Sequence, residues 1–131
     1  MSSASILDST KRNLGIDATY PAFDDDIIMH INSVFVTLAQ LGIGPINGFA
    51  IQGSTETWDL FLGSNLLLNS VKTYVYLRVR LLFDPPTTSY LIESLNQQRL
   101  ELEWRLTAYQ DNLTWVDPSS APVLLVDGGG I

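Results

Sequence analysis

The sequence contains no cysteine, which excludes a disulfide framework and any metal site built on thiolates. Its single histidine, His30, lies inside a strongly patterned apolar segment, so we expect neither a histidine metal centre nor a catalytic triad. Basic residues are also few, because 7 lysines and arginines stand against 14 aspartates and glutamates, a net charge of −7. Tight binding to nucleic-acid phosphates and adhesion to an anionic membrane both need clustered cations. The composition therefore argues against both kinds of partner.

No secretory signal and no membrane-spanning segment are predicted. Residues 1–13 lack a basic start followed by an apolar run. The longest apolar stretch, residues 66–83, contains Lys72, Arg78 and Arg80, and a helix in lipid rarely carries three cations. Even so, 46% of the residues are apolar and only 16% are charged. We therefore expect apolar surface that takes part in contacts between subunits.

Hydrophobic spacing predicts an all-α fold: a small bundle of about four to five helices with a short extended loop and an extended C-terminal tail. The expected helices are residues 3–14, 24–41, 58–62, 65–83 and 89–111. The fourth is apolar on most sides, which favours a central position. Asp24, Asp25 and Asp26 are expected to cap the second helix and to stabilise the positive end of its dipole.

Threonines and prolines mark the ends of the later helices. Thr55 or Thr57 is expected to cap the short helical turn, and Thr87 or Thr88 the fifth helix, after the break at residues 84–86. The glycine-rich connection, residues 42–54, is expected to form a short strand or an extended loop, since its glycines do not match a phosphate-binding loop.

Charged residues are spaced in pairs along the fifth helix and unevenly along the fourth. In the fifth, Arg99 with Glu103 and Glu101 with Arg105 have the spacing of solvated ion pairs. In the fourth, residues 66–83 contain three cations and no acidic residue. We interpret this asymmetry as a possible contact between subunits, the alternative being that each cation reaches solvent or pairs within its own chain. The candidate interface residues are Lys72, Arg78, Arg80, Asp24, Asp25 and Asp26.

A change of composition after residue 114 predicts a helical domain, residues 1–114, and an extended arm, residues 115–131. Prolines and a run of three glycines exclude a helix in the arm. Between them, Val123, Leu124, Leu125 and Val126 form an apolar strip with strand propensity. Such a strip suits strand addition to a partner protein, and the alternative is that it covers its own domain.

Three features carry a resemblance to the head-to-tail connector, or adaptor, proteins of long-tailed bacteriophages, especially those that infect Gram-positive bacteria. The first is Ile16-Asp17 followed by the acid-rich helix start at residues 24–28. The second is the turn at residues 82–87, with the sequence Leu-Phe-Asp-Pro-Pro-Thr. The third is the long amphipathic helix at residues 90–113, with a tail rich in glycine and proline. The resemblance covers residues 4–115.

The resemblance implies a structural virion protein with no catalytic residues and no cofactor. Such a subunit would be made in the host cytoplasm and would form a dodecameric ring in the virion neck, below the portal protein. The ring would extend the DNA channel, let DNA pass without sequence-specific binding, and dock a stopper or other neck protein. The C-terminal arm, with Val123 to Val126, would contact the portal. The alternative is a small phage-encoded binding or regulatory protein that acts on a host protein.

Overall fold

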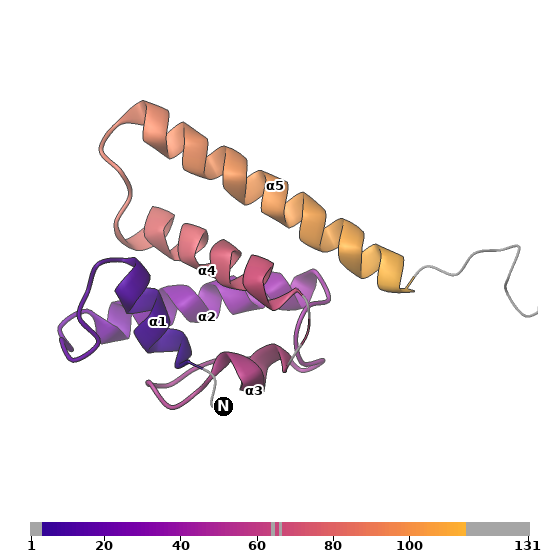
Figure 1. The fold of residues 1–131 in the computed structure, drawn as a ribbon, viewed down its shortest axis with the longest axis horizontal. Coiled ribbons are helices and arrows are strands. Elements are labelled where there is room, and N and C mark those ends of the chain that lie inside the picture. The colour runs from indigo at the N-terminus through magenta and orange to yellow at the C-terminus, as the bar shows by residue number, and fades with distance from the viewer. Residues whose placement is uncertain (1–3, 64, 66, 115–131) are drawn as a thin grey trace, which may run out of the picture.

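The computed structural model describes residues 4–63, 65 and 67–114, with side chains as far as residue 110. Within these residues the elements, shown in Figure 1, are α1 (Ile6–Asn13), α2 (Asp24–Gln40), α3 (Trp58–Leu62), α4 (Leu68–Phe83) and α5 (Ser89–Thr114). The described part contains no strand, only one isolated antiparallel bridge between Ser5 and Thr57. The predicted all-α class is therefore confirmed.

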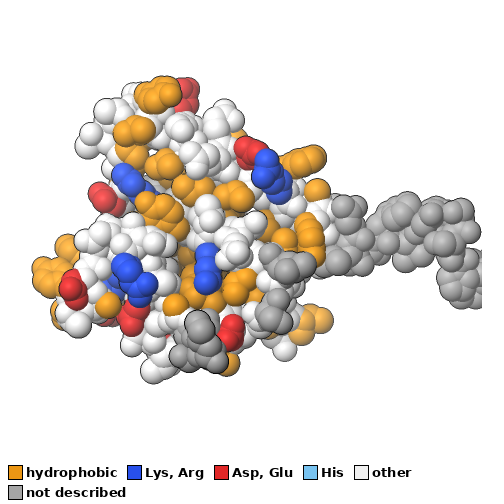
Figure 2. All heavy atoms as spheres, in the orientation of Figure 1, with side chains coloured by type: hydrophobic (Ala, Val, Ile, Leu, Met, Phe, Trp, Pro, Cys, Tyr) orange, Lys and Arg blue, Asp and Glu red, His pale blue; other side chains and the backbone are white. Residues whose placement is uncertain are grey.

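Helix α4 lies in the middle of the molecule, as its wide apolar surface predicted. It packs against α2 on one side and α5 on the other, while α1 contacts both α2 and α4 (Figure 1). Its buried residues are Val71, Tyr74, Val75, Leu77 and Val79. On the face drawn in Figure 2, hydrophobic side chains also reach the surface over α4 and α5.

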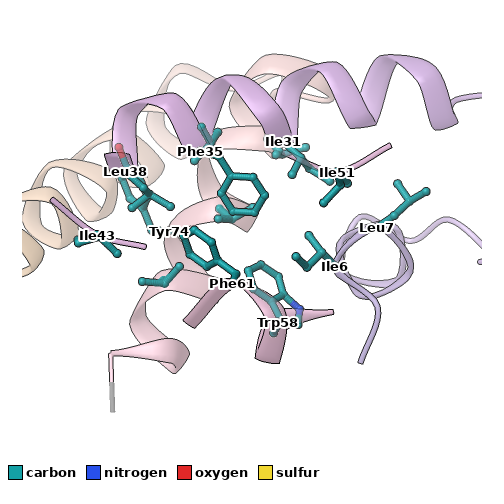
Figure 3. Packing of buried hydrophobic residues seen from close by; sticks show 14 of the residues in the cluster. Ile6, Leu7, Ile31, Phe35, Leu38, Ile43, Ile51, Trp58, Phe61 and Tyr74 are labelled. Atoms are coloured by element: carbon teal, nitrogen blue, oxygen red, sulfur yellow. The ribbon is translucent and has the colours of Figure 1, made fainter. Parts of the chain in front are cut away.

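Aromatic rings occupy the centre of the core (Figure 3). The short helix α3 contributes Trp58 and Phe61, and the Phe61 ring centroid lies 4.6 Å from that of Phe35 on α2. The Trp58 indole N–H donates to Ser9 on α1 at 2.9 Å, so one buried side chain joins α3 to α1. Gly44 has a φ of +96°, and a Cβ atom at that position would lie 2.5 Å from the Phe61 ring. Packing of the Phe61 ring against the connection that follows α2 therefore requires glycine at position 44.

Two of the predicted helix caps are confirmed. Thr57 caps α3 by accepting from the Leu60 amide at 3.4 Å, and Thr88 accepts from the Leu91 amide at 3.4 Å at the start of α5. Helices α1 and α4 begin later than predicted, at Ile6 and Leu68, and α5 runs further, to Thr114. Helix ends fray, and spacing alone fixes them to within a few residues.

The predicted aspartate cap of α2 is wrong. Phe23 occupies the N-cap position, and no side chain there hydrogen-bonds the first turn. Asp24, Asp25 and Asp26 instead form the first turn itself. Their charges still lie at the positive end of the helix dipole, which they stabilise by attraction rather than by capping.

Candidate functional site

All three α4 cations chosen from the sequence lie close to aromatic side chains of their own chain. The Lys72 ammonium lies 5.8 Å from the centre of the Trp58 ring, a cation–π distance. Arg80 donates to the Tyr76 hydroxyl at 3.3 Å. Both side chains are half-buried, and Lys72 and Tyr76 line one shallow pocket beside the end of α1. Their contact with a neighbouring copy stays a prediction.

Arg78 belongs to a polar network that joins α4 to α5. Its guanidinium donates to the Tyr74 hydroxyl at 2.7 Å, and that hydroxyl donates to the Glu103 carboxylate at 2.6 Å. Arg99 completes the network with an ion pair to Glu103 at 3.0 Å. Burial first, and then the hydrogen bond to Glu103, raise the pKa of Tyr74 to about 12, while Arg78 acts to lower it. Arg78 therefore helps to hold α5 in place.

Both ion pairs predicted along α5 are present. The pair between Arg99 and Glu103 lies partly covered at the contact with α4, while Arg105 and Glu101 form theirs in the open. The sequence showed the spacing of Arg99 and Glu103 on one helix. It did not show that Glu103 also faces Arg78 across the helix pair, because that contact depends on how α4 and α5 pack.

The acidic residues at the start of α2 divide into one that is paired and two that are exposed. Asp24 forms an ion pair at 2.6 Å with Lys11, whose side chain is fully buried. The Lys11 ammonium also donates to the backbone carbonyls of Ala18 at 3.0 Å and Tyr20 at 2.7 Å. It thereby fixes the connection between α1 and α2. Asp25 and Asp26 are exposed and remain available to a partner.

Sequence reasoning missed Lys11, which has no local signal of burial. It lies among polar neighbours on a short helix, and its partners come from residues 7 to 13 positions further along the chain. Only the folded connection brings them together. Among the described residues, no group of histidine, aspartate and glutamate side chains is placed to hold a metal ion.

The outer face of α5 presents two large apolar side chains that the sequence interpretation did not select. Leu102 and Leu106 face the protein, and Leu106 is 1% exposed. Leu100 and Trp104 lie one turn apart on the opposite side of the helix, where they are 49% and 71% exposed. Tryptophan is highly buried on average, so a tryptophan this exposed beside an exposed leucine is a candidate contact for a partner. We call Leu100 and Trp104 the α5 outer patch.

A hollow of about 590 Å³ lies between the second half of α2 and the following connection. Phe35 and Phe49 pack edge to face beside it, with ring centroids 5.4 Å apart. Val36 and Ile46 form its exposed rim and are 58% and 98% exposed. None of its lining residues carries a charge. We call this region the α2 hollow.

The remaining candidate site, Val123, Leu124, Leu125 and Val126, lies outside the described residues, as does the whole predicted arm. Helix α5 is described as far as Thr114, and the predicted boundary between domain and arm stays a prediction. Within the part of the chain that the structure describes, no helix is long and apolar enough to cross a membrane.

A family model described as "Phage connector protein" matches residues 6–113, from the first residue of α1 almost to the end of α5. No curated protein and no solved structure matches the chain significantly.

Proposed function

The chain belongs to the phage connector protein family, and from that premise we propose that it forms a ring below the portal in the neck of a tailed phage. Family membership supports a structural role in connecting parts of the virion. The proposed ring extends the DNA channel of the portal and presents a docking surface for a stopper or other neck protein. The observation that carries this proposal is that the family match spans all five helices.

The charge distribution supports passage of DNA without retention. The chain has a net charge of −7, so a channel wall made of its copies repels phosphates. Several of its cations are also engaged within the chain: Lys11 pairs with Asp24, and Arg78 and Arg99 pair with Glu103. A cation that is paired with a carboxylate contributes little to binding a phosphate. The proposed ring therefore guides DNA without holding it.

Charged residues of opposite sign on α2 and α4 support the proposed subunit contact. Asp25 and Asp26 are exposed at the start of α2, and the half-buried Lys72 and Arg80 lie on α4 beside aromatic side chains of their own chain. We propose that these two cations approach the two aspartates of the next copy. Arg78 and Asp24 support that contact indirectly, because each stabilises the element on which it lies.

Charge reversal tests this contact. Changing Lys72 and Arg80 together to glutamate should weaken assembly, and changing Asp25 and Asp26 to lysine in the same chain should restore it. Assembly is measured by sedimentation velocity in the presence of portal rings. Arg12→Glu serves as the control, since it reverses an exposed cation on α1. If the variant that carries only Lys72→Glu and Arg80→Glu assembles as well as the unmodified protein, the contact is refuted.

The proposed position below the portal is tested by co-sedimentation of the purified protein with portal rings from the same phage. Electron microscopy of the pelleted material should show a second ring stacked on one end of the portal. A sample without portal rings controls for self-association. If a folded protein does not bind the portal, the position is wrong, and the alternative of a regulator that binds a host protein becomes the better hypothesis.

A further inference from the structure

The α5 outer patch has the composition of an interface centre rather than of a solvated helix face. Helix α5 packs mainly on α4, through the side opposite Leu100 and Trp104. Trp104 therefore has most of its indole in solvent, at 71% exposure. Tryptophan is the residue type most enriched among side chains that dominate binding energy. Its flanking charges, Glu101 and Arg105, neutralise one another in an ion pair.

The α2 hollow has the complementary shape and chemistry. Phe49 gives it an aromatic wall, backed by the buried ring of Phe35, and Val36 and Ile46 form an apolar rim. Its volume of about 590 Å³ exceeds that of one indole side chain. Its lining carries no charge, so burial of an apolar side chain there would leave no charged group without solvent or a partner.

These two surfaces cannot meet within one chain. Helix α4 lies between α2 and α5 and packs against both (Figure 1). Trp104 lies on the side of α5 opposite Leu102 and Leu106, which face the protein, so it points away from α2. A protrusion and a hollow at different places on one molecule make a heterologous contact, which generates a ring when the rotation closes. We propose that Trp104 of one copy inserts into the α2 hollow of the next copy. This inference rests on the proposed ring.

Charge favours a second copy as the occupant. Two chains of net charge −7 repel one another, and a contact between surfaces that carry no net charge adds nothing to that repulsion. The uncharged α2 hollow and the α5 outer patch with its neutral ion pair are such surfaces. A basic partner would instead be drawn to the exposed carboxylates elsewhere on the chain.

The size of the patch predicts that each contact is weak by itself. A buried tryptophan contributes roughly 150–250 Å² and a leucine somewhat less, while a stable pair of proteins buries about 800 Å² on each partner. One such contact is therefore too small for a stable dimer. In a closed ring every copy makes the contact twice, and a portal template would raise the local concentration of copies. Free protein should accordingly be monomeric when dilute and should assemble when it is concentrated or bound to a template.

The absence of native cysteine makes a cross-linking test specific. Ala108→Cys places a thiol one turn beyond Trp104, and Asn47→Cys places one in the lining of the α2 hollow. The two single variants are mixed and treated with a short bis-maleimide, both as concentrated free protein and on portal rings. We expect the mixed 108–47 product in preference to 108–108 and 47–47 products. Adding Trp104→Ala should lower its yield about tenfold, as loss of a dominant interface residue would.

A matched control and two contrary outcomes complete the test. Tyr20→Ala removes another exposed aromatic side chain, from the connection between α1 and α2, and should leave the yield unchanged. The inference is overturned if the 108–47 product is absent from both samples, or if Asn47→Cys links only to the portal protein. Portal-bound rings without that product would leave the proposed function standing. If the 108–47 product forms in free protein and the protein does not bind the portal, the proposed position is wrong and the proposed contact between copies stands.

Discussion

At the scale of single residues, Lys11 is the clearest case of a buried polar side chain whose contacts stabilise the fold. Its ammonium is fully buried and contacts the Asp24 carboxylate and two backbone carbonyls. Lys11→Met keeps the length of the side chain but leaves these acceptors without a donor. Because Asp24 is 30% exposed, water compensates part of the loss. We expect the free energy of unfolding to fall by about 3 kcal/mol, the lower end for breaking a buried ion pair.

Urea denaturation followed by circular dichroism measures this change. Arg12→Met is the matched control, since it removes an exposed cation from the next position on the same helix. Its effect should stay within about 0.5 kcal/mol. Equal effects of the two substitutions would mean that the Lys11 contacts contribute nothing specific to stability.

The raised pKa of Tyr74 predicts how the free energy of unfolding changes at alkaline pH. Burial, followed by the hydrogen bond to Glu103, raises its pKa to about 12, whereas an unfolded tyrosine has a pKa of about 10. The folded state therefore binds more protons than the unfolded state between these values. The stability that Tyr74 contributes is complete below pH 10 and is lost as the pH rises toward 12.

Tyr74→Phe tests that assignment. Loss of the hydroxyl leaves Glu103 and Arg78 with one partner fewer, so the free energy of unfolding at pH 8 should fall by about 1 kcal/mol. The decline of stability between pH 10 and 12 should also become shallower than in the unmodified protein. Denaturation curves at both ends of this range measure the two effects. If the free energy of unfolding of the variant declines as steeply between pH 10 and 12 as that of the unmodified protein, other groups cause the decline.

At the scale of elements, α5 depends on one helix for most of its packing. Its main contact is with α4, and Leu106 is the most deeply buried of its residues up to Gln110. Leu106→Ala should lower the free energy of unfolding by about 3 kcal/mol, as cavity formation in a core does. Leu100→Ala, on the outer face of the same helix, should change it by less than about 0.5 kcal/mol.

Hydrogen exchange distinguishes local from global loss in the Leu106→Ala variant. Helix α2 is held by contacts with both α1 and α4, so its amides should keep their protection when α5 opens. The amides of α5 should exchange faster than in the unmodified protein. Equal acceleration in α2 and α5 would show that the helices unfold as one unit.

The sequence predicted those elements whose signals are local. Apolar spacing located all five helices, threonines located two of the caps, and the wide apolar surface placed α4 at the centre. The α2 cap was wrong because three adjacent aspartates fit the start of a helix equally well as cap or as first turn. The Lys11 contacts, the α2 hollow and the outward direction of Trp104 depend on tertiary packing. Local patterns carry no information about such contacts.

At the scale of the whole molecule, the helical body and the C-terminal arm are predicted to have separate roles. The family match covers residues 6–113, and α5 is described as far as Thr114, so the match takes in the described helices almost completely. The described core consists of residues from Ile6 to Leu106. The arm's apolar residues, Val123 to Val126, are therefore proposed to serve a partner, the portal, rather than the body.

Deletion of residues 118–131 tests this division of roles. The shortened protein should keep its helical circular dichroism and its midpoint of unfolding, because every described core contact remains. It should lose co-sedimentation with portal rings, since the apolar strip is gone. A full-length variant with serine at positions 123–126 should behave in the same way, which separates the strip from the length of the arm. Global unfolding of either variant would instead mean that the strip covers its own domain. If both variants still bind the portal, the helices and not the arm contact it.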